Sequence, residues 1–130
     1  SLRAALKEAG VSQSRDSVFT VPHRENERGP AIRRMLSARP GFTAVITSDG
    51  ELASMVIASA REAGREVPRD LSVVAYEPLD TPGHPEISGP RIDFEEMGRQ
   101  AGHLVKEPVS APQQIRFPAK WHQGVTVAAP

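Results

Sequence analysis

The chain has 130 residues, a length that suits a single domain. Hydrophobic residues make up 38% and charged residues 25%, which is typical of a globular rather than a disordered chain. Sixteen basic and sixteen acidic side chains cancel, so the chain lacks the positive excess of a non-specific nucleic-acid binder. There is no cysteine, which excludes disulfides, thiolate nucleophiles and cysteine-ligated zinc.

The sequence shows no recognisable targeting signal and no membrane segment. No apolar run approaches the ~18 residues of a membrane span, and no signal-peptide segment opens the chain. We therefore expect a cytoplasmic protein without membrane contact. The chain opens at Ser1 inside a helical pattern, so we expect further residues upstream. Residues 41–100 concentrate eleven acidic side chains against five basic ones.

The first third of the sequence predicts helix, strand and helix. Leu2–Ala9 has helical apolar spacing and is followed by Gly10, a common residue just beyond a helix. Val18–Val21 is a short β-prone run. Pro30 is expected at the first position of the second helix, because its fixed φ suits that place. The predicted buried stripe of this helix is Ile32, Met35 and Leu36.

Two strong strands with a helix between them follow. Thr43–Thr47 is a compact apolar strand, and Ser48 with Glu51 forms a capping-box pattern that opens the next helix. Gly64 is expected to end that helix. Its predicted face consists of Leu52, Met55, Val56, Ser59, Ala60 and Ala63. Leu71–Tyr76 is apolar on both faces, as parallel strands covered by helices are.

The last third predicts one more helix and two short strands. A loop over residues 78–90 precedes a second capping-box pattern, Asp93 with Glu96, which opens a helix over residues 94–106. The apolar stripe of this helix is Phe94, Met97, Ala101, Leu104 and Val105. A linker over 108–114 and terminal strands over 115–117 and 121–127 complete the pattern.

The alternation of helices and strands predicts an α/β fold, a mainly parallel sheet with helices on both faces. In such sheets ligands bind outside the carboxyl ends of the strands. That rule groups His23, Ser48, Asp49 and Glu77 into one candidate site.

Each candidate residue also has a purely structural interpretation. Ser48 or Asp49 can cap the following helix, a role compatible with ligand contact by the other. Glu77 can be a rim residue. Asp93 is better explained as a helix cap than as a ligand contact. Phe94 is better explained as a core anchor, although an aromatic ring at a crevice can stack on a sugar.

Catalytic, metal and cofactor sites find no support in the sequence. The four histidines are scattered without metal-ligand spacing, so we expect no metal. Neither a nucleophile elbow nor a glycine-rich phosphate loop is present, so we expect no enzyme and no cofactor. Residues 8–14 look like the turn of a DNA-reading helix-turn-helix, but the β-prone residues that follow argue against a recognition helix.

Two segments resemble LacI/GalR-type transcription regulators. Thr43–Ser54, TAVITSDGELAS, is similar to their T-A-hydrophobic segment ending N-D-x-x-A, and Ala63–Glu77, AGREVPRDLSVVAYE, is similar to A-G-x-x-V-P-x-D-x-S-V-V-G-[FY]-D. Pro85–Ser88, Met97-Gly98 and Leu2–Gly10 match shorter motifs in the same order.

The resemblance implies that residues 1–130 are the C-terminal part of an effector-binding region, one lobe of a two-lobed periplasmic-binding-protein-like fold. It implies that the helix over 94–106 belongs to the other lobe, so that its apolar stripe lacks its usual partner here and favours dimerisation, swapping or disorder. The helix over 52–63 matches one that lines dimer interfaces.

By position, the resemblance implies that the ligand is contacted by Ser48, Asp49, Glu77 and Phe94. Ser48 replaces the Asn of the motif and Glu77 its Asp. The function implied is sensing of a small polar effector, such as a sugar or polyol, by a homodimer that binds operator DNA through an N-terminal domain outside this chain. The alternatives are an exported solute-binding protein of a transporter and, less well supported, a phospho-receiver that uses Asp49.

Overall fold

The computed structural model describes residues 2–11, 17–38, 41–77, 85–106 and 114–128. The chain divides into two compact units, residues 1–39 and residues 40–130. Residues 78–84 of the predicted loop over 78–90, and most of the predicted linker over 108–114, lie outside the described residues.

The N-terminal unit contains two helices, α1 (Leu2–Glu8) and α2 (Glu25–Ala38). Gly10 has a φ of 71° just beyond α1, and the amide of Val11 donates to the carbonyl of Leu6 at 2.8 Å. This left-handed glycine ends the helix as predicted. The predicted strand Val18–Val21 is wrong, because these residues form no strand. A β-prone run needs a partner strand, and propensity alone does not supply one.

Helix α2 begins five residues earlier than predicted. Glu25 and Glu27 lie in its first turn, where negative charge favours the helix N-terminus. Pro30 lies inside the helix, where it omits one backbone hydrogen bond without ending the helix. The predicted stripe is confirmed, since Ile32, Met35 and Leu36 are all buried.

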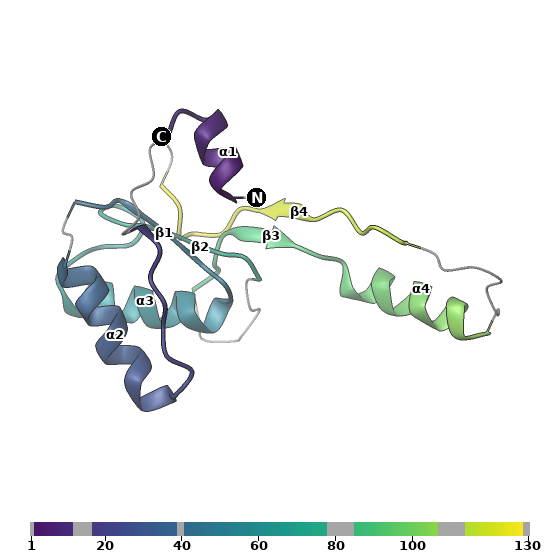
Figure 1. Cartoon of the computed structure of the whole chain (residues 1–130), viewed down its shortest axis with the longest axis horizontal. Helices are drawn as coiled ribbons and strands as arrows, with labels where there is room; N and C mark the ends of the chain where they lie inside the picture. The colour runs from purple at the N-terminus through teal and green to yellow at the C-terminus, as the bar shows by residue number, and fades with distance from the viewer. Residues whose placement is uncertain (1, 12–16, 39–40, 78–84, 107–113, 129–130) are drawn as a thin grey trace. The chain divides into compact units, whose positions relative to one another are not determined.

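Strands β1 (Ala44–Thr47) and β2 (Ser72–Ala75) pair in parallel within the second unit. Their register runs from Ala44 opposite Ser72 to Thr47 opposite Ala75. Helix α3 (Gly50–Glu62) connects the two strands and packs against both (Figure 1). This strand–helix–strand unit confirms the predicted α/β class and the parallel pairing.

Two details of α3 differ from the prediction. Its N-cap is Asp49 rather than Ser48, because the Asp49 carboxylate accepts the Leu52 amide at 2.8 Å. Its predicted face is confirmed at Val56, Ser59 and Ala60, which are buried. Ala53 and Ile57 are buried as well, whereas Ala63 is exposed. Small alanines allow the helix to approach the strands closely, whereas Leu52 and Met55 are only half-buried. Gly64, with a φ of 74°, ends the helix as predicted.

An antiparallel pair forms where no pair was predicted. β3 (Gly89–Arg91) pairs with β4 (Lys120–His122), with Gly89 opposite His122 (Figure 1). β3 contains Gly and Pro, which give little β signal, so its strand character comes from pairing rather than propensity. The predicted strand over 115–117 is absent, and the predicted strand over 121–127 shortens to β4.

The free edge of β2 is closed by two segments, residues 86–88 and 124–128. Ser88 bridges Val74 in parallel, and the Val73 amide donates to the Thr126 carbonyl at 2.8 Å. The Thr126 hydroxyl, with the residue 1% exposed, donates to the Val73 carbonyl at 2.6 Å and accepts the Ser88 amide at 3.0 Å. The core of this unit therefore surrounds β2. Its fully buried apolar side chains on and around the strand are Leu71, Val73, Ala75 and Ile87.

Helix α4 (Phe94–Lys106) begins at the predicted cap, because the Asp93 carboxylate accepts the Glu96 amide at 2.9 Å. None of its residues is buried, and it contacts no other named helix or strand of the described residues. Phe94 is 65% exposed and Val105 86% exposed. Among the described residues, the apolar stripe of α4 is therefore not covered by another helix or strand.

Candidate functional site

The carboxyl ends of β1 and β2 lie side by side. Thr47 and Ala75, the last residues of the two strands, are register partners, and the Tyr76 amide donates to the Thr47 carbonyl at 3.0 Å. The parallel ladder therefore continues one residue past β2. Ser48 and Asp49 follow β1 directly, and Glu77 follows β2 after Tyr76. All three residues therefore lie at one edge of the strand pair, the edge formed by the carboxyl ends of the two strands.

Asp49 caps helix α3 with one carboxylate oxygen and binds Ser48 with the other. Its Oδ1 accepts the Leu52 amide at 2.8 Å, and its Oδ2 accepts the Ser48 hydroxyl at 2.8 Å. The Asp49 carbonyl also accepts the Thr47 hydroxyl at 2.7 Å. These bonds fix the half-buried Asp49 at the strand end. The structural interpretation of Asp49 as a helix cap is therefore observed, and each carboxylate oxygen keeps a further acceptor site for another donor.

The other residues at this edge are open to solvent. Ser48 and Glu77 are exposed, and Tyr76, between β2 and Glu77, is 65% exposed. Sequence reasoning placed Tyr76 inside the strand and did not assign it to the site. The signal that could have identified it is an aromatic residue directly before the acid that ends an apolar strand.

Phe94 and His23 are not brought to this edge by any observed contact. Phe94 is the first residue of α4, and its exposure contradicts its interpretation as a core anchor. His23 is exposed and belongs to the N-terminal unit. The strand expected before His23 is absent, so the strand-end argument for it no longer applies. Ligand contact by either residue stays a prediction.

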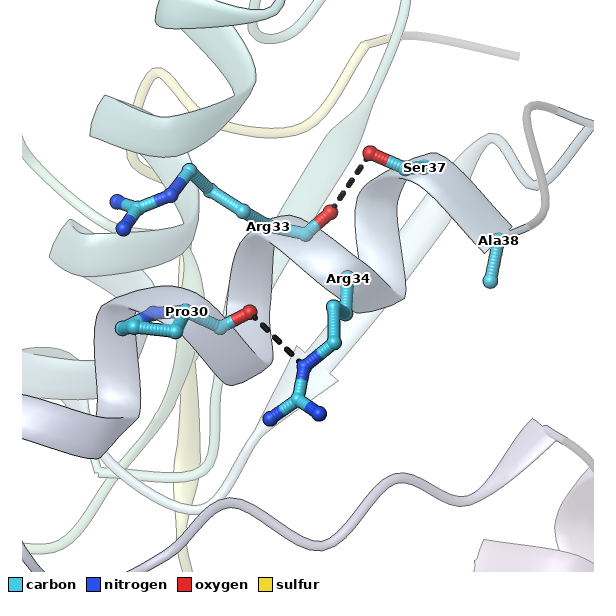
Figure 2. A pocket seen from close by; sticks show the side chains of 5 residues that line it. All are labelled: Pro30, Arg33, Arg34, Ser37 and Ala38. Atoms are coloured by element: carbon cyan, nitrogen blue, oxygen red, sulfur yellow. Dashed lines mark hydrogen bonds between the residues drawn. The ribbon is translucent and has the colours of Figure 1, made fainter.

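An open hollow of about 610 Å³ lies on α2 and shares no residue with this edge. Figure 2 shows the side chains of Arg33 and Arg34 pointing apart. The Arg34 Nε donates to the Pro30 carbonyl at 3.4 Å, and the Ser37 hydroxyl donates to the Arg33 carbonyl at 2.9 Å (Figure 2). Both hydrogen bonds join residues within α2, and the two arginine side chains do not converge on a common point. The hollow therefore has no arrangement that favours a ligand.

Among the described residues, no three His, Asp or Glu side chains come together in a way that could hold a metal ion. No helix in the described ranges is long and apolar enough to cross a membrane.

A sequence model of the periplasmic binding protein-like domain matches residues 1–127. The chain belongs to this family. No curated protein sequence matches the chain. The periplasmic binding protein-like assignment agrees with the parallel strand–helix–strand unit.

Several solved structures share this fold. A LacI family transcriptional regulator from Arthrobacter sp. FB24 aligns with a TM-score of 0.79 at 19% identity, over 98% of this chain and 50% of that one. The transcriptional regulator CelR in complex with cellobiose aligns with a TM-score of 0.76 at 20% identity, over 95% of this chain and 40% of that one. The transcription regulator CcpA of Lactococcus lactis gives 0.74 at 20% identity, over 98% and 48%.

The family model thus confirms the predicted periplasmic-binding-protein-like region, and the solved structures show that LacI-family regulators have the same fold. The periplasmic binding protein-like chain spans half or less of the length of these three regulators.

Proposed function

We propose that this chain is the ligand-sensing part of a LacI/GalR-type transcription regulator rather than an enzyme. Its ligand is a small polar effector, such as a sugar or polyol, held against Ser48, Asp49 and Glu77, with Phe94 and His23 as further contacts. The regulator acts as a cytoplasmic homodimer and binds operator DNA through an N-terminal domain outside residues 1–130.

One observation carries this proposal: the parallel register that ends with Thr47 opposite Ala75. Asp49 and Glu77 each lie two residues beyond this pair, so the register brings two acidic residues to the carboxyl ends of neighbouring strands. Carboxylates accept hydrogen bonds strongly from hydroxyl groups, and a hydroxyl such as that of Ser48 can both donate and accept. This combination suits a ligand rich in hydroxyls.

The exposure of the apolar stripe of helix α4 is an argument for a two-lobed protein. A 13-residue helix with an apolar stripe and no buried residue needs a partner outside the described contacts. We assign it to the second lobe of the complete effector-binding region. A ligand between the lobes then favours one hinge angle, and the shift changes operator affinity by a coupling free energy of about 1–3 kcal/mol.

Isothermal titration calorimetry on the full-length protein tests the site. The panel contains glucose, cellobiose, sorbitol, adenine and glutamine. For a compound that binds, Glu77→Ala should weaken affinity by about tenfold or more, because a hydrogen bond to a charged group is lost. Glu62→Ala, which removes an exposed acid at the far end of α3, is the matched control and should leave affinity unchanged.

The regulatory part is tested by fluorescence anisotropy with operator DNA. The compound that binds should change operator affinity by about five- to 150-fold. The ligand site is wrong if Glu77→Ala binds as tightly as the wild type, and the regulator assignment is wrong if ligand leaves operator affinity unchanged.

A further inference from the structure

Tyr76, the chain's single tyrosine, is held at the edge of the candidate site by its backbone. Its amide donates to the Thr47 carbonyl at 3.0 Å, which extends the β1–β2 ladder by one bond. The residue before it, Ala75, is 0% exposed, whereas Tyr76 is 65% exposed. The chain therefore leaves the core at this point with a fixed backbone and an aromatic side chain that the described residues leave largely uncovered.

The surface next to Tyr76 is partly apolar and partly polar. Side chains alternate along a strand, so Tyr76 continues the face of Val74, whose register partner is Ile46. Ile46 is 48% exposed although it lies in the middle of a strand. Ser48, two residues after Ile46, supplies a hydroxyl next to this apolar strip, and Glu77, the residue after Tyr76, adds a carboxylate at the same end of the strand pair.

This combination matches the chemistry of a pyranose. A pyranose ring carries hydroxyls around its rim and a face of C–H groups, so it needs polar acceptors at its edge and an apolar surface below it. An aromatic ring is a large, rigid apolar surface with few rotatable bonds, and its hydroxyl adds a hydrogen-bonding group. An acyclic polyol has the hydroxyls but no flat apolar face.

We propose that Tyr76 contacts the ligand directly, with its ring against the apolar face of a cyclic sugar. The inference rests on the proposed function and narrows its ligand class to pyranoses. Tyr76 acts as a specificity-determining residue: it distinguishes a ring from an open chain, while Asp49 and Glu77 bind hydroxyls of either.

The test is calorimetry on the full-length protein with glucose, cellobiose and sorbitol. At least one of the two pyranoses should bind more tightly than sorbitol. Tyr76→Leu should weaken binding of that pyranose by about three- to tenfold, and Tyr76→Phe, which keeps the ring, should weaken it less. The affinity for sorbitol should change little in Tyr76→Leu.

Trp121→Leu is the matched control. Trp121 is 57% exposed, comparable to Tyr76, but it belongs to β4 in the antiparallel pair. Its replacement should leave pyranose affinity unchanged. Thermal unfolding of each variant verifies that it is folded, which we expect because both residues are exposed.

The possible failures separate the two proposals. If a pyranose binds with wild-type affinity to Tyr76→Leu, or if sorbitol binds as tightly as the pyranoses, the role of Tyr76 is refuted and the sensor function stands. If no compound of the full panel binds the wild type, the proposed function fails, and the role of Tyr76 fails with it.

Discussion

Replacing Gly124 with alanine tests how tightly the segments beside β2 are packed. A Cβ atom at this position would overlap the carbonyl oxygen of Glu86 and lie 2.7 Å from the Glu86 carbonyl carbon and 2.8 Å from that of Ile87. All three atoms belong to the backbone, so no flexible side chain can move aside. To restore ordinary contact, residues 86–87 and 124 must separate by well over half an ångström.

Such a separation breaks two of the hydrogen bonds that join the segments, the two nearest to residue 124. These are the Val125 amide to the Glu86 carbonyl at 2.8 Å and the Gly124 amide to the Ser88 hydroxyl at 3.1 Å. Each contributes about 0.5–1.5 kcal/mol, and forcing a methyl group into a packed site costs about 1–3 kcal/mol. We expect Gly124→Ala to lower the free energy of unfolding by about 2–6 kcal/mol, the sum of these terms.

Urea unfolding measured by circular dichroism gives this free energy, with a lower midpoint at an unchanged slope as the expected result. Gly41→Ala is the matched control: no atom lies within 4 Å of its Cβ position, so we expect a change within about 0.5 kcal/mol. If Gly124→Ala unfolds at the same urea concentration as the wild type, residues 86–88 and 124–126 do not pack as described.

Three further predictions concern stability. Thr126→Val should cost about 2–4 kcal/mol in urea unfolding, because it leaves the buried Ser88 amide and Val73 carbonyl without their hydroxyl partner, whereas Thr126→Ser should retain most of the stability. Asp49→Ala should destabilise α3 by about 1 kcal/mol in the same assay through loss of its cap, and Asp49→Asn should not, so equal losses would contradict the capping role. The side-chain hydrogen bond from Arg69, together with a backbone amide bond, lowers the pKa of Asp70. Its contribution to stability is therefore full above the unfolded-state pKa and is lost as the pH falls through the lower folded-state pKa. The difference in unfolding free energy between wild type and Asp70→Asn should be positive at pH 7 and vanish in strong acid, and a difference that persists there would exclude this cause.

The elements that sequence predicted well are those with local signals. Strands β1 and β2 appear as short apolar runs, and their parallel pairing follows from the helix between them. The glycines at 10 and 64 end their helices because both adopt the positive φ that side chains disfavour. Asp93 caps α4 as its spacing to Glu96 predicted. In each case residues within a few positions of one another decide the structure.

The elements that sequence missed depend on distant partners. β3 is a strand because Gly89 meets His122 across the antiparallel pair, and neither Gly89 nor Pro90 gives a strand signal of its own. Val18–Val21 has the composition of a strand but no partner, so it forms none. The buried face of α3 was predicted only in part, because Leu52 and Met55 are as apolar as the true core residues, and only packing distinguishes them.

The candidate site, too, could be predicted from the sequence only in part. Strand-end logic predicted that Asp49 and Glu77 would leave neighbouring strands at one edge, and the register confirms it. It could not predict that both oxygens of Asp49 already accept hydrogen bonds from Leu52 and Ser48, nor that Tyr76 is exposed. Those facts depend on backbone geometry at the strand ends.

The segment that closes the free edge of β2 has a consequence for how this protein is made. Thr126 bonds to Val73, a residue 53 positions earlier, so the stretch of this edge beside Val73 is closed only after residue 126 has left the ribosome, whereas Ser88 can pair with Val74 much sooner. A growing polypeptide that stops before residue 124 lacks the bonds from the Thr126 side chain to Val73 and Ser88, so this part of the β2 edge stays open until that segment is made.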